Sequence, residues 1–316
     1  MGGKAAHPAE ERTKNEAVMK LYIGNSKHVQ IQKALKHVNH FCFEPVGRGH
    51  LPDHKCKVLL DSGAFADVRR GRLSFEHALE RQLKYEIKNN FISEKIVSYD
   101  LLIDEQLQGD RQIKSRWKEK AGWSAVDVTV AAAEFLISHR EELRPRQLVL
   151  SCQGVTPEQY IECARRILEI ASPEDCFGLG GWCIVGQQRH LAKLFWKAIN
   201  AILPMIAAAG MKDIHVFGLA YVPLIRDFAI ACKSFGLESS NDTTRFYCEL
   251  SRGYTFVSEL GKSLYYSGQL ATGRNLALDH QLAIANIEAA YKFFAHIEDW
   301  KSPIELFGGG YNNAPK

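Results

Sequence analysis

The chain has 316 residues, of which 46% are hydrophobic and 24% are charged, and its formal net charge at pH 7 is +4. These proportions are typical of a globular protein and exclude a disordered chain, a collagen-like repeat and a coiled coil. No run of about 18 apolar residues occurs, and residues 1–14 lack an apolar core, so neither a membrane span nor a secretory signal is predicted. We therefore expect a cytoplasmic enzyme or binding protein.

Short apolar, strand-like runs alternate with helical patterns along the chain. The predicted strands cover residues 20–23, 58–60, 96–99, 148–151, 176–179, 214–217, 237–240 and 254–257, and 237–240 is the weakest of them. The predicted helices cover residues 75–89, 125–140, 157–170, 188–208, 224–235 and 276–297. In 157–170 the apolar residues recur at helical spacing, and Thr156-Pro157 is a typical helix start.

This alternation predicts an α/β fold built from parallel βαβ units. About eight strands in one chain favour a (β/α)8 TIM barrel over an open doubly wound sheet. We expect residues 1–50 to be an N-terminal extension, residues 51–302 to form the barrel, and the glycine-containing residues 303–316 to be a flexible tail.

Polar residues directly after the predicted strands are the first functional candidates, because TIM-barrel active sites lie at the carboxyl ends of the strands. These residues are Asp61-Ser62-Gly63, Asp100 with Asp104 four residues on, Gln153-Gly154, Gly180-Gly181, Gly218 and Asn241-Asp242-Thr243. A single aspartate after a strand is often only the N-cap of the next helix. Three carboxylates together with an amide, and with glycines that let a flat ligand approach the backbone, indicate a binding or catalytic site.

These segments resemble motifs of the tRNA-guanine transglycosylase superfamily. Asp61-Ser62-Gly63-Ala64-Phe65 is similar to the Asp-Ser-Gly-Gly-(Phe/Tyr) signature, and Gln153-Gly154 resembles the Gln-Gly-Gly segment. Residues 180–186 resemble the Gly-Gly-Leu-Ala-Val-Gly loop with one residue more, and residues 215–218 resemble the His-x-x-Gly strand end. The stretch 276–300 is similar to the closing helix, so the resemblance runs from about residue 59 to residue 300.

The resemblance implies a pentosyltransferase that exchanges guanine in a nucleic acid for a 7-deazaguanine, without a cofactor, through a covalent aspartate–sugar intermediate. Asp242 would be the nucleophile, and Asp61 the acid/base or base-contacting carboxylate. Asp100 would bind the amino and ring N–H edge of the purine. The remaining base-binding residues implied are Ser62, Gln153, Gly180 and Gly181.

Two departures from the family pattern bear on the nucleophile and on the substrate. The family's nucleophile usually lies five residues after a glycine, and from Gly236 that position is Asn241, one before Asp242. The tRNA enzymes also bind zinc through Cys-x-Cys-x-x-Cys and a later histidine, whereas only Cys248 and His280 correspond here. We therefore expect no zinc subdomain and no bound metal. The sequence looks more like the 7-deazaguanine DNA transglycosylases, which makes DNA the expected substrate, a preQ0-type base the expected partner, and tRNA the alternative.

Basic residues follow two of the strand-end aspartates. Arg69 and Arg70 come after the Asp61 motif, and a longer run with interleaved tryptophans follows Asp100. Loops after barrel strands lie at the mouth, where such residues can contact phosphates. The predicted nucleic-acid contacts are Arg69, Arg70, Arg111, Lys114 and Arg116; the alternative is a solvated helix face.

Two further interpretations stay open. The shifted Asp242 is compatible with a non-catalytic nucleic-acid-binding subunit that works with a partner protein or as a homodimer. A metal-dependent hydrolase is the other, because six potential ligands lie close together in the sequence. These are His37, His40, Cys42, His50, His54 and Cys56. None of the eight cysteines forms a Cys-x-x-Cys motif, so most are expected to be buried reduced thiols.

Overall fold

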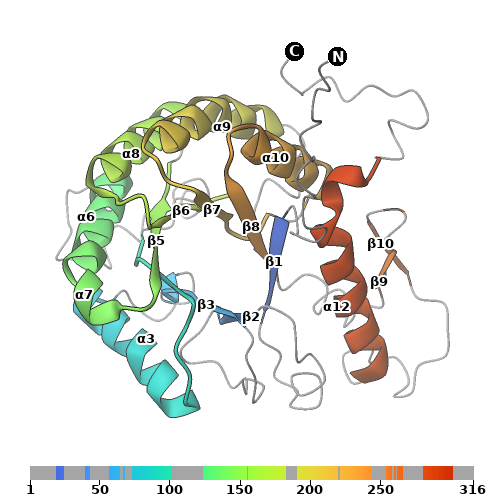
Figure 1. The fold of residues 1–316 in the computed structure, drawn as a ribbon, viewed down its shortest axis with the longest axis horizontal. Helices are drawn as coiled ribbons and strands as arrows, with labels where there is room; N and C mark the ends of the chain where they lie inside the picture. The colour runs from blue at the N-terminus through green and yellow to red at the C-terminus, as the bar shows by residue number, and fades with distance from the viewer. Residues whose placement is uncertain are drawn as a thin grey trace, which may run out of the picture.

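The computed structural model describes residues 19–24, 40–42, 57–64, 67, 73–100, 124–154, 156–182, 191–219, 221–243, 254–257, 260, 262–265 and 280–301. Within these ranges eight parallel strands form a closed barrel in sequence order, with the last strand paired to the first (Figure 1). The strands are β1 (Met19–Gly24), β2 (His40–Cys42), β3 (Val58–Leu60), β4 (Lys95–Val97), β5 (Gln147–Cys152), β6 (Cys176–Leu179), β7 (Asp213–Val216) and β8 (Glu238–Thr243). The fold is thus α/β and of the TIM-barrel type.

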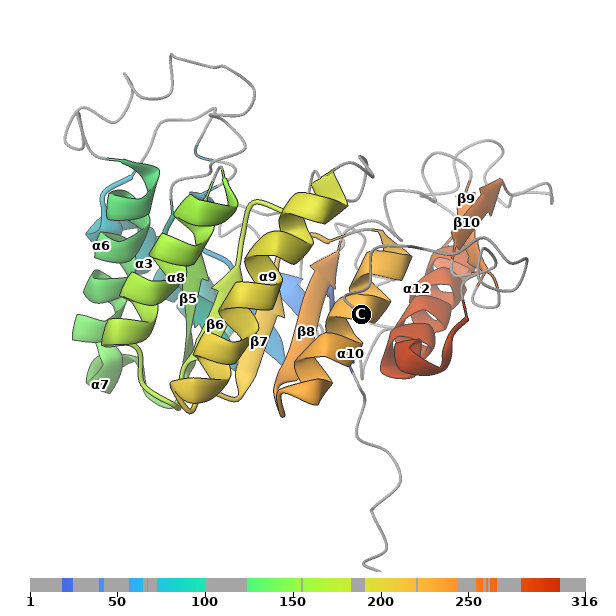
Figure 2. The ribbon, with the colours of Figure 1, turned by 90° about the horizontal axis from the view of Figure 1, so that it is seen from above.

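Helices cover the outside of the barrel. They are α3 (Phe75–Asn89), α6 (Ala125–Ser138), α7 (Arg140–Leu143), α8 (Pro157–Ile170), α9 (Leu191–Ala208), α10 (Val222–Ser234) and α12 (His280–Ala295), followed by the short 3-10 helix η5 (Ile297–Asp299). Figure 2 shows α6, α8, α9 and α10 standing side by side around the strands, and α12 packs beside β1. None of the helices in the described ranges is long and apolar enough to cross a membrane.

Local sequence signals explain where these helices begin. The Thr156 side chain accepts a hydrogen bond from the Gln159 N–H at 3.3 Å, and Pro157 occupies the first turn of α8. Ser124 and Asp127 form a reciprocal capping box at the start of α6. The predicted helices are confirmed, with boundary differences of a few residues.

The interior of the barrel is filled by side chains from alternate strand positions. A central layer contains Tyr22, Leu59, Val97, Val149 and Cys176, all buried. This packed layer lies in the barrel interior, and sites in barrels of this type lie at the carboxyl ends of the strands. The described cysteines at positions 152, 163, 176 and 232 are buried and free, as expected.

The largest corrections concern the predicted start of the barrel and the last predicted strand. The predicted N-terminal extension, residues 1–50, contains two barrel strands, β1 and β2, so the barrel begins before the predicted boundary at residue 51. The predicted strand 254–257 is β9 (Tyr254–Val257), which pairs antiparallel with β10 (Lys262–Tyr265) in a separate two-stranded sheet. Since β8 already pairs with β1, the closed barrel has no free edge for another strand. The predicted tail, residues 303–316, lies outside the described residues.

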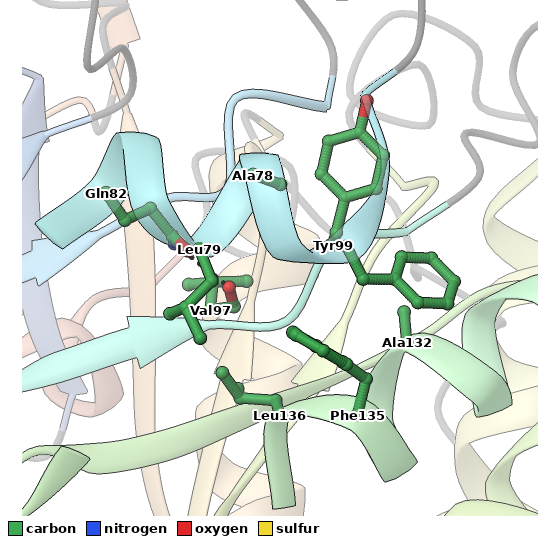
Figure 3. Close-up of a pocket in the computed structure, with 9 residues that line it drawn as sticks. Ala78, Leu79, Gln82, Val97, Tyr99, Ala132, Phe135 and Leu136 are labelled. Atoms are coloured by element: carbon green, nitrogen blue, oxygen red, sulfur yellow. Dashed lines mark hydrogen bonds between the residues drawn. The ribbon is translucent and has the colours of Figure 1, made fainter. Parts of the chain in front are cut away.

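A small cavity lies between α3, β4 and α6 (Figure 3). Its volume is about 10 Å³, which is at most enough for one water molecule. Its lining is mainly apolar, and the amide of Gln82 is already occupied, donating to the carbonyls of Leu60 and Val97 at 3.3 and 3.0 Å. We interpret it as a packing gap, too small to hold a substrate.

Candidate active site at the mouth of the barrel

All three predicted carboxylates lie at the carboxyl ends of barrel strands. Asp61 follows β3 directly, Asp100 lies three residues after β4, and Asp242 is the penultimate residue of β8. Gln153 follows β5, and Gly180 and Gly181 follow β6. Because parallel barrel strands all end at the same face, these residues share one mouth.

The charges of Asp100 and Asp242 both act on Asp61, as expected for three carboxylates at one mouth. The pKa of Asp61 is raised to about 8, first by burial and then by the negative charges of Asp100 and Asp242. The backbone N–H groups of Ser62 and Gly63 oppose this rise without cancelling it. A carboxyl group with this pKa is mostly protonated at neutral pH, so Asp61 can act as a general acid.

Asp242 is held by two donors that converge on one oxygen. Its Oδ1 lies 3.1 Å from Nε2 of His215 and accepts a hydrogen bond from the Gly218 N–H at 2.9 Å. No donor among the described residues contacts Oδ2. The carboxylate thus has one fixed oxygen and one oxygen available for chemistry, the arrangement expected of a positioned nucleophile.

The alternation of side chains along β8 decides between Asn241 and Asp242. Asp242 and Ser240 point into the barrel toward His215, whereas the amide of Asn241 donates to the Leu219 carbonyl on the other side of the strand at 2.9 Å. In a strand, a shift of one residue moves a side chain to the opposite face. The carboxylate at the mouth is therefore that of Asp242, despite the family spacing that favours position 241.

Asp100 and Gln153 form a second polar pair at the mouth. The Gln153 amide Nε2 donates to Oδ2 of Asp100, and both side chains are buried. Oε1 of Gln153 is buried and accepts no hydrogen bond from the described residues. A buried amide oxygen without a donor is costly, so this atom is a candidate contact for a ligand N–H group.

Gly180 supports Gln153 but does not offer its own backbone to a ligand. Its N–H donates to the Cys152 carbonyl at 3.0 Å, and its carbonyl accepts from the Tyr160 hydroxyl. The base-binding role predicted for Gly181 stays a prediction; its φ of 76° is in the region favoured by glycine.

Ser62 is likewise occupied by the local structure. It is buried, and its Oγ accepts a hydrogen bond from the Ala64 N–H at 3.3 Å. Its carbonyl accepts from Nη2 of Arg81 at 2.6 Å. The predicted base-binding role of Ser62 stays a prediction, and its contacts in the structure shape the turn that carries Asp61.

An ion-paired network that the sequence analysis missed braces the loops bearing Asp61 and Asp100. Arg81, on α3, donates to both carboxylate oxygens of Asp67 at 2.7 and 2.8 Å. The Tyr99 hydroxyl also donates to Asp67, at 3.0 Å. The available sequence signal was a second aspartate six residues after Asp61.

His215 was noted only as part of His-x-x-Gly, and its role depends on the pairing of β7 with β8.

Several predicted residues lie outside the described residues. These are Arg69, Arg70, Arg111, Lys114, Arg116, Asp104, Cys248, His37, His50, His54 and Cys56, together with the side chains of His40, Cys42 and His280. Their predicted roles stay predictions. Among the residues that the structure does describe, no group of three or more histidine, cysteine or carboxylate side chains is arranged to hold a metal ion.

Comparison with known proteins gives no match to a family model. A search of the curated proteins gives no significant match either. The functional assignment accordingly depends on the chemistry of the barrel mouth and on the motif resemblance described above.

Proposed function

We propose that this protein is a base-exchange glycosyltransferase that replaces guanine in DNA with a 7-deazaguanine such as preQ0. The observation that carries the proposal is the pairing of two carboxylates with different roles at one mouth. Asp61 is held mostly protonated, with a pKa of about 8, while Asp242 has one oxygen fixed by His215 and Gly218. An acid beside a positioned nucleophile suits double displacement at a sugar carbon.

In the first half-reaction Oδ2 of Asp242 attacks the anomeric carbon of the target nucleotide. The bond between that carbon and the guanine nitrogen breaks, its electron pair moves to the base, and Asp61 supplies the proton that neutralises the departing purine. The products are a covalent ester between Asp242 and the sugar, free guanine, and ionised Asp61. The target nucleotide has to be turned out of its helix to reach the mouth.

The second half-reaction reverses these roles. The ionised Asp61 accepts a proton from the incoming 7-deazaguanine, whose nitrogen attacks the anomeric carbon and displaces Asp242. Asp100 and Oε1 of Gln153 supply acceptors for the N–H groups on the edge of either base, because a carboxylate and an amide oxygen only accept. No cofactor is needed, since the glycosidic bond is exchanged without a change in oxidation state.

The substrate is proposed to be DNA because the cysteines that hold zinc in the tRNA enzymes have no full counterpart in this sequence. The same exchange on tRNA is the second candidate, favoured by the same motifs. A non-catalytic subunit is the third, and it would bind nucleic acid without turnover.

The test is incorporation of labelled guanine and of a labelled 7-deazaguanine into duplex DNA and, in parallel, into unmodified tRNA. Label in DNA supports the proposal; label only in tRNA corrects the substrate and retains the mechanism. Label in neither contradicts the proposal.

Asp242→Asn should abolish exchange and should trap no covalent adduct on denaturing gels. Asp213→Asn is a matched control, because Asp213 begins β7 at the opposite end of the barrel, where it accepts from Gln147 at 2.6 Å. It should retain exchange. Full activity of the Asp242→Asn variant would show that Asp242 is not the nucleophile.

A further inference from the structure

A buried chain of side chains extends from Asp242 into the barrel interior. His215, on β7, is fully buried, and its Nδ1 lies 2.9 Å from Oγ of Ser240. His215 and Ser240 are directly paired residues of neighbouring strands, so their side chains share the interior face. The order Ser240–His215–Asp242 therefore runs from the interior to the mouth.

Both ring nitrogens of His215 are engaged, which determines where its protons lie. The pKa of His215 is lowered, chiefly by burial and only partly offset by Asp242, so the ring is neutral at pH 7. The charges of Lys95 and Lys20 also lower this pKa. The rings of Tyr22 and Phe217 pack against the imidazole ring. A neutral imidazole has one donor and one acceptor nitrogen.

The carboxylate of Asp242 can only accept, so the proton belongs on Nε2 and Nδ1 must accept from Ser240. The Ser240 hydroxyl has a second acceptor within reach, the Ile214 carbonyl, but at the longer distance of 3.3 Å. Donation to that carbonyl would place the ring proton on Nδ1 and turn the Nε2 lone pair toward the carboxylate. By donating to Nδ1, Ser240 stabilises the tautomer that lets His215 donate to Asp242.

We infer that His215 and Ser240 are positioning residues for Asp242: Ser240 stabilises the Nε2-protonated tautomer of His215, and His215, together with the Gly218 N–H, holds Oδ1 so that Oδ2 faces the sugar carbon. This inference rests on the proposed function, in which Asp242 is the nucleophile. His215 thus holds the carboxylate by a hydrogen bond from a neutral ring and not by an ion pair with an imidazolium.

The kinetic test compares two substitutions of His215 by amide side chains of different length. His215→Gln keeps an N–H donor at the distance of Nε2, whereas the shorter side chain of His215→Asn does not. We expect kcat to fall about 100-fold in His215→Asn, as for a misplaced reacting group, with KM for the base unchanged. His215→Gln should recover about tenfold of that loss, and Ser240→Ala should lower kcat by about tenfold.

Ser93→Ala is the matched control for Ser240→Ala. Ser93 is also buried, and it donates to Glu86 at 2.5 Å ahead of β4, at the amino-terminal end of the strands. This variant should lose stability without a change in kcat. Equal kcat values in wild type, Ser240→Ala and His215→Asn would overturn the inference.

A second measurement determines the tautomer of His215 directly and does not depend on enzyme activity. The ¹⁵N shifts of the histidine rings, with His215 assigned by the signal missing from His215→Gln, should show a neutral ring protonated on Nε2 at pH 7. In Ser240→Ala the signal should move toward the other tautomer. A doubly protonated ring, or a proton on Nδ1 in the wild type, would overturn the inference. Absence of exchange by the wild type on DNA and tRNA would instead remove the proposed function, whichever tautomer is found.

Discussion

Gly180 lies directly beneath the side-chain amide of Gln153. A Cβ atom at position 180 would collide with Nε2 of Gln153 and come within 2.8 Å of its Cδ, closer than packed atoms approach. The absence of a side chain at position 180 therefore allows Gln153 to reach Asp100. This glycine serves a neighbouring side chain, and its own backbone groups are satisfied within the protein.

Gly180→Ala should displace the Gln153 amide and weaken binding of the free base. Loss of hydrogen bonds to a buried polar pair corresponds to about 1–3 kcal/mol, so the dissociation constant should rise by about 10- to 100-fold. Titration calorimetry with guanine and with a 7-deazaguanine measures this change directly. Unchanged affinity would remove Gln153 from the base-binding site.

Gly236→Ala is the control for this substitution. Gly236 has a φ of 71° and nothing within 4 Å of an added Cβ, so alanine there introduces backbone strain alone. The variant should lose about 1–2 kcal/mol of stability and bind the base as the wild type does.

The raised pKa of Asp61 predicts how stability depends on pH. The folded protein binds this proton more tightly than the unfolded chain, whose ordinary value is 3.8. The stabilisation is fully present below about pH 4 and is lost as the pH rises through about 8. Asp61→Asn removes the charge, so this variant should exceed the wild type by about 1–3 kcal/mol at pH 9, after discounting for the partial exposure of Asp61.

Urea unfolding at pH 5 and pH 9 compares the two proteins. Their difference in unfolding free energy should increase toward pH 9 in favour of the variant. A difference independent of pH would mean that the pKa of Asp61 is not raised. Exchange activity of the wild type should also decline above about pH 8, where Asp61 loses the proton that it supplies in the first step.

Asn241→Asp tests which face of β8 carries the nucleophile. A carboxylate at this buried position would face the Leu219 carbonyl that now accepts from the Asn241 amide. We expect a loss of about 2–3 kcal/mol in stability, measured by chemical denaturation. In the Asp242→Asn background the substitution should restore no exchange, and recovery of activity in the double variant would contradict the assignment of Asp242.

The fold and the three carboxylates could be predicted because both depend on the apolar strand runs and on the residues that follow them. Parallel strands buried on both faces are apolar runs, and the residues after them meet at one mouth. β2, His40–Cys42, was missed because it begins with a histidine and was interpreted as part of a set of potential metal ligands, whereas the equally short β3 is the wholly apolar run Val58–Leu60. The predicted strand 237–240 ended two residues before Asp242, whereas β8 extends to Thr243 and includes Asp242.

The partners of the carboxylates could not be predicted in the same way. Contact between His215 and Asp242 depends on the register of β7 against β8, which neither strand's own pattern contains. The same holds for Arg81 and Asp67, which are brought together by the packing of α3 against the turn after β3.

Substitutions of Asp67 and Tyr99 test whether their hydrogen-bond network with Arg81 positions the loops that carry Asp61 and Asp100. Asp67 is almost fully buried, and Arg81 contacts both of its oxygens as well as the Ser62 carbonyl. Asp67→Ala leaves the Arg81 charge without its partner, so we expect a loss of about 3–5 kcal/mol in stability. Tyr99→Phe removes one hydrogen bond to Asp67 and should cost about 0.5–1.5 kcal/mol.

A double-mutant cycle of Asp67→Ala and Arg81→Met separates the pair from its surroundings. The double variant should be less destabilised than the sum of the single variants by about 2 kcal/mol, because the second change removes the charge that the first leaves buried. The Tyr99→Phe variant should remain folded, so its exchange activity measures how well the network positions the loops of Asp61 and Asp100. We expect kcat to fall by about tenfold as the loops of Asp61 and Asp100 shift relative to each other. Additive losses in the cycle, with normal kcat in Tyr99→Phe, would show that Arg81 and Asp67 do not act as a unit and that the mouth is held by the barrel strands alone.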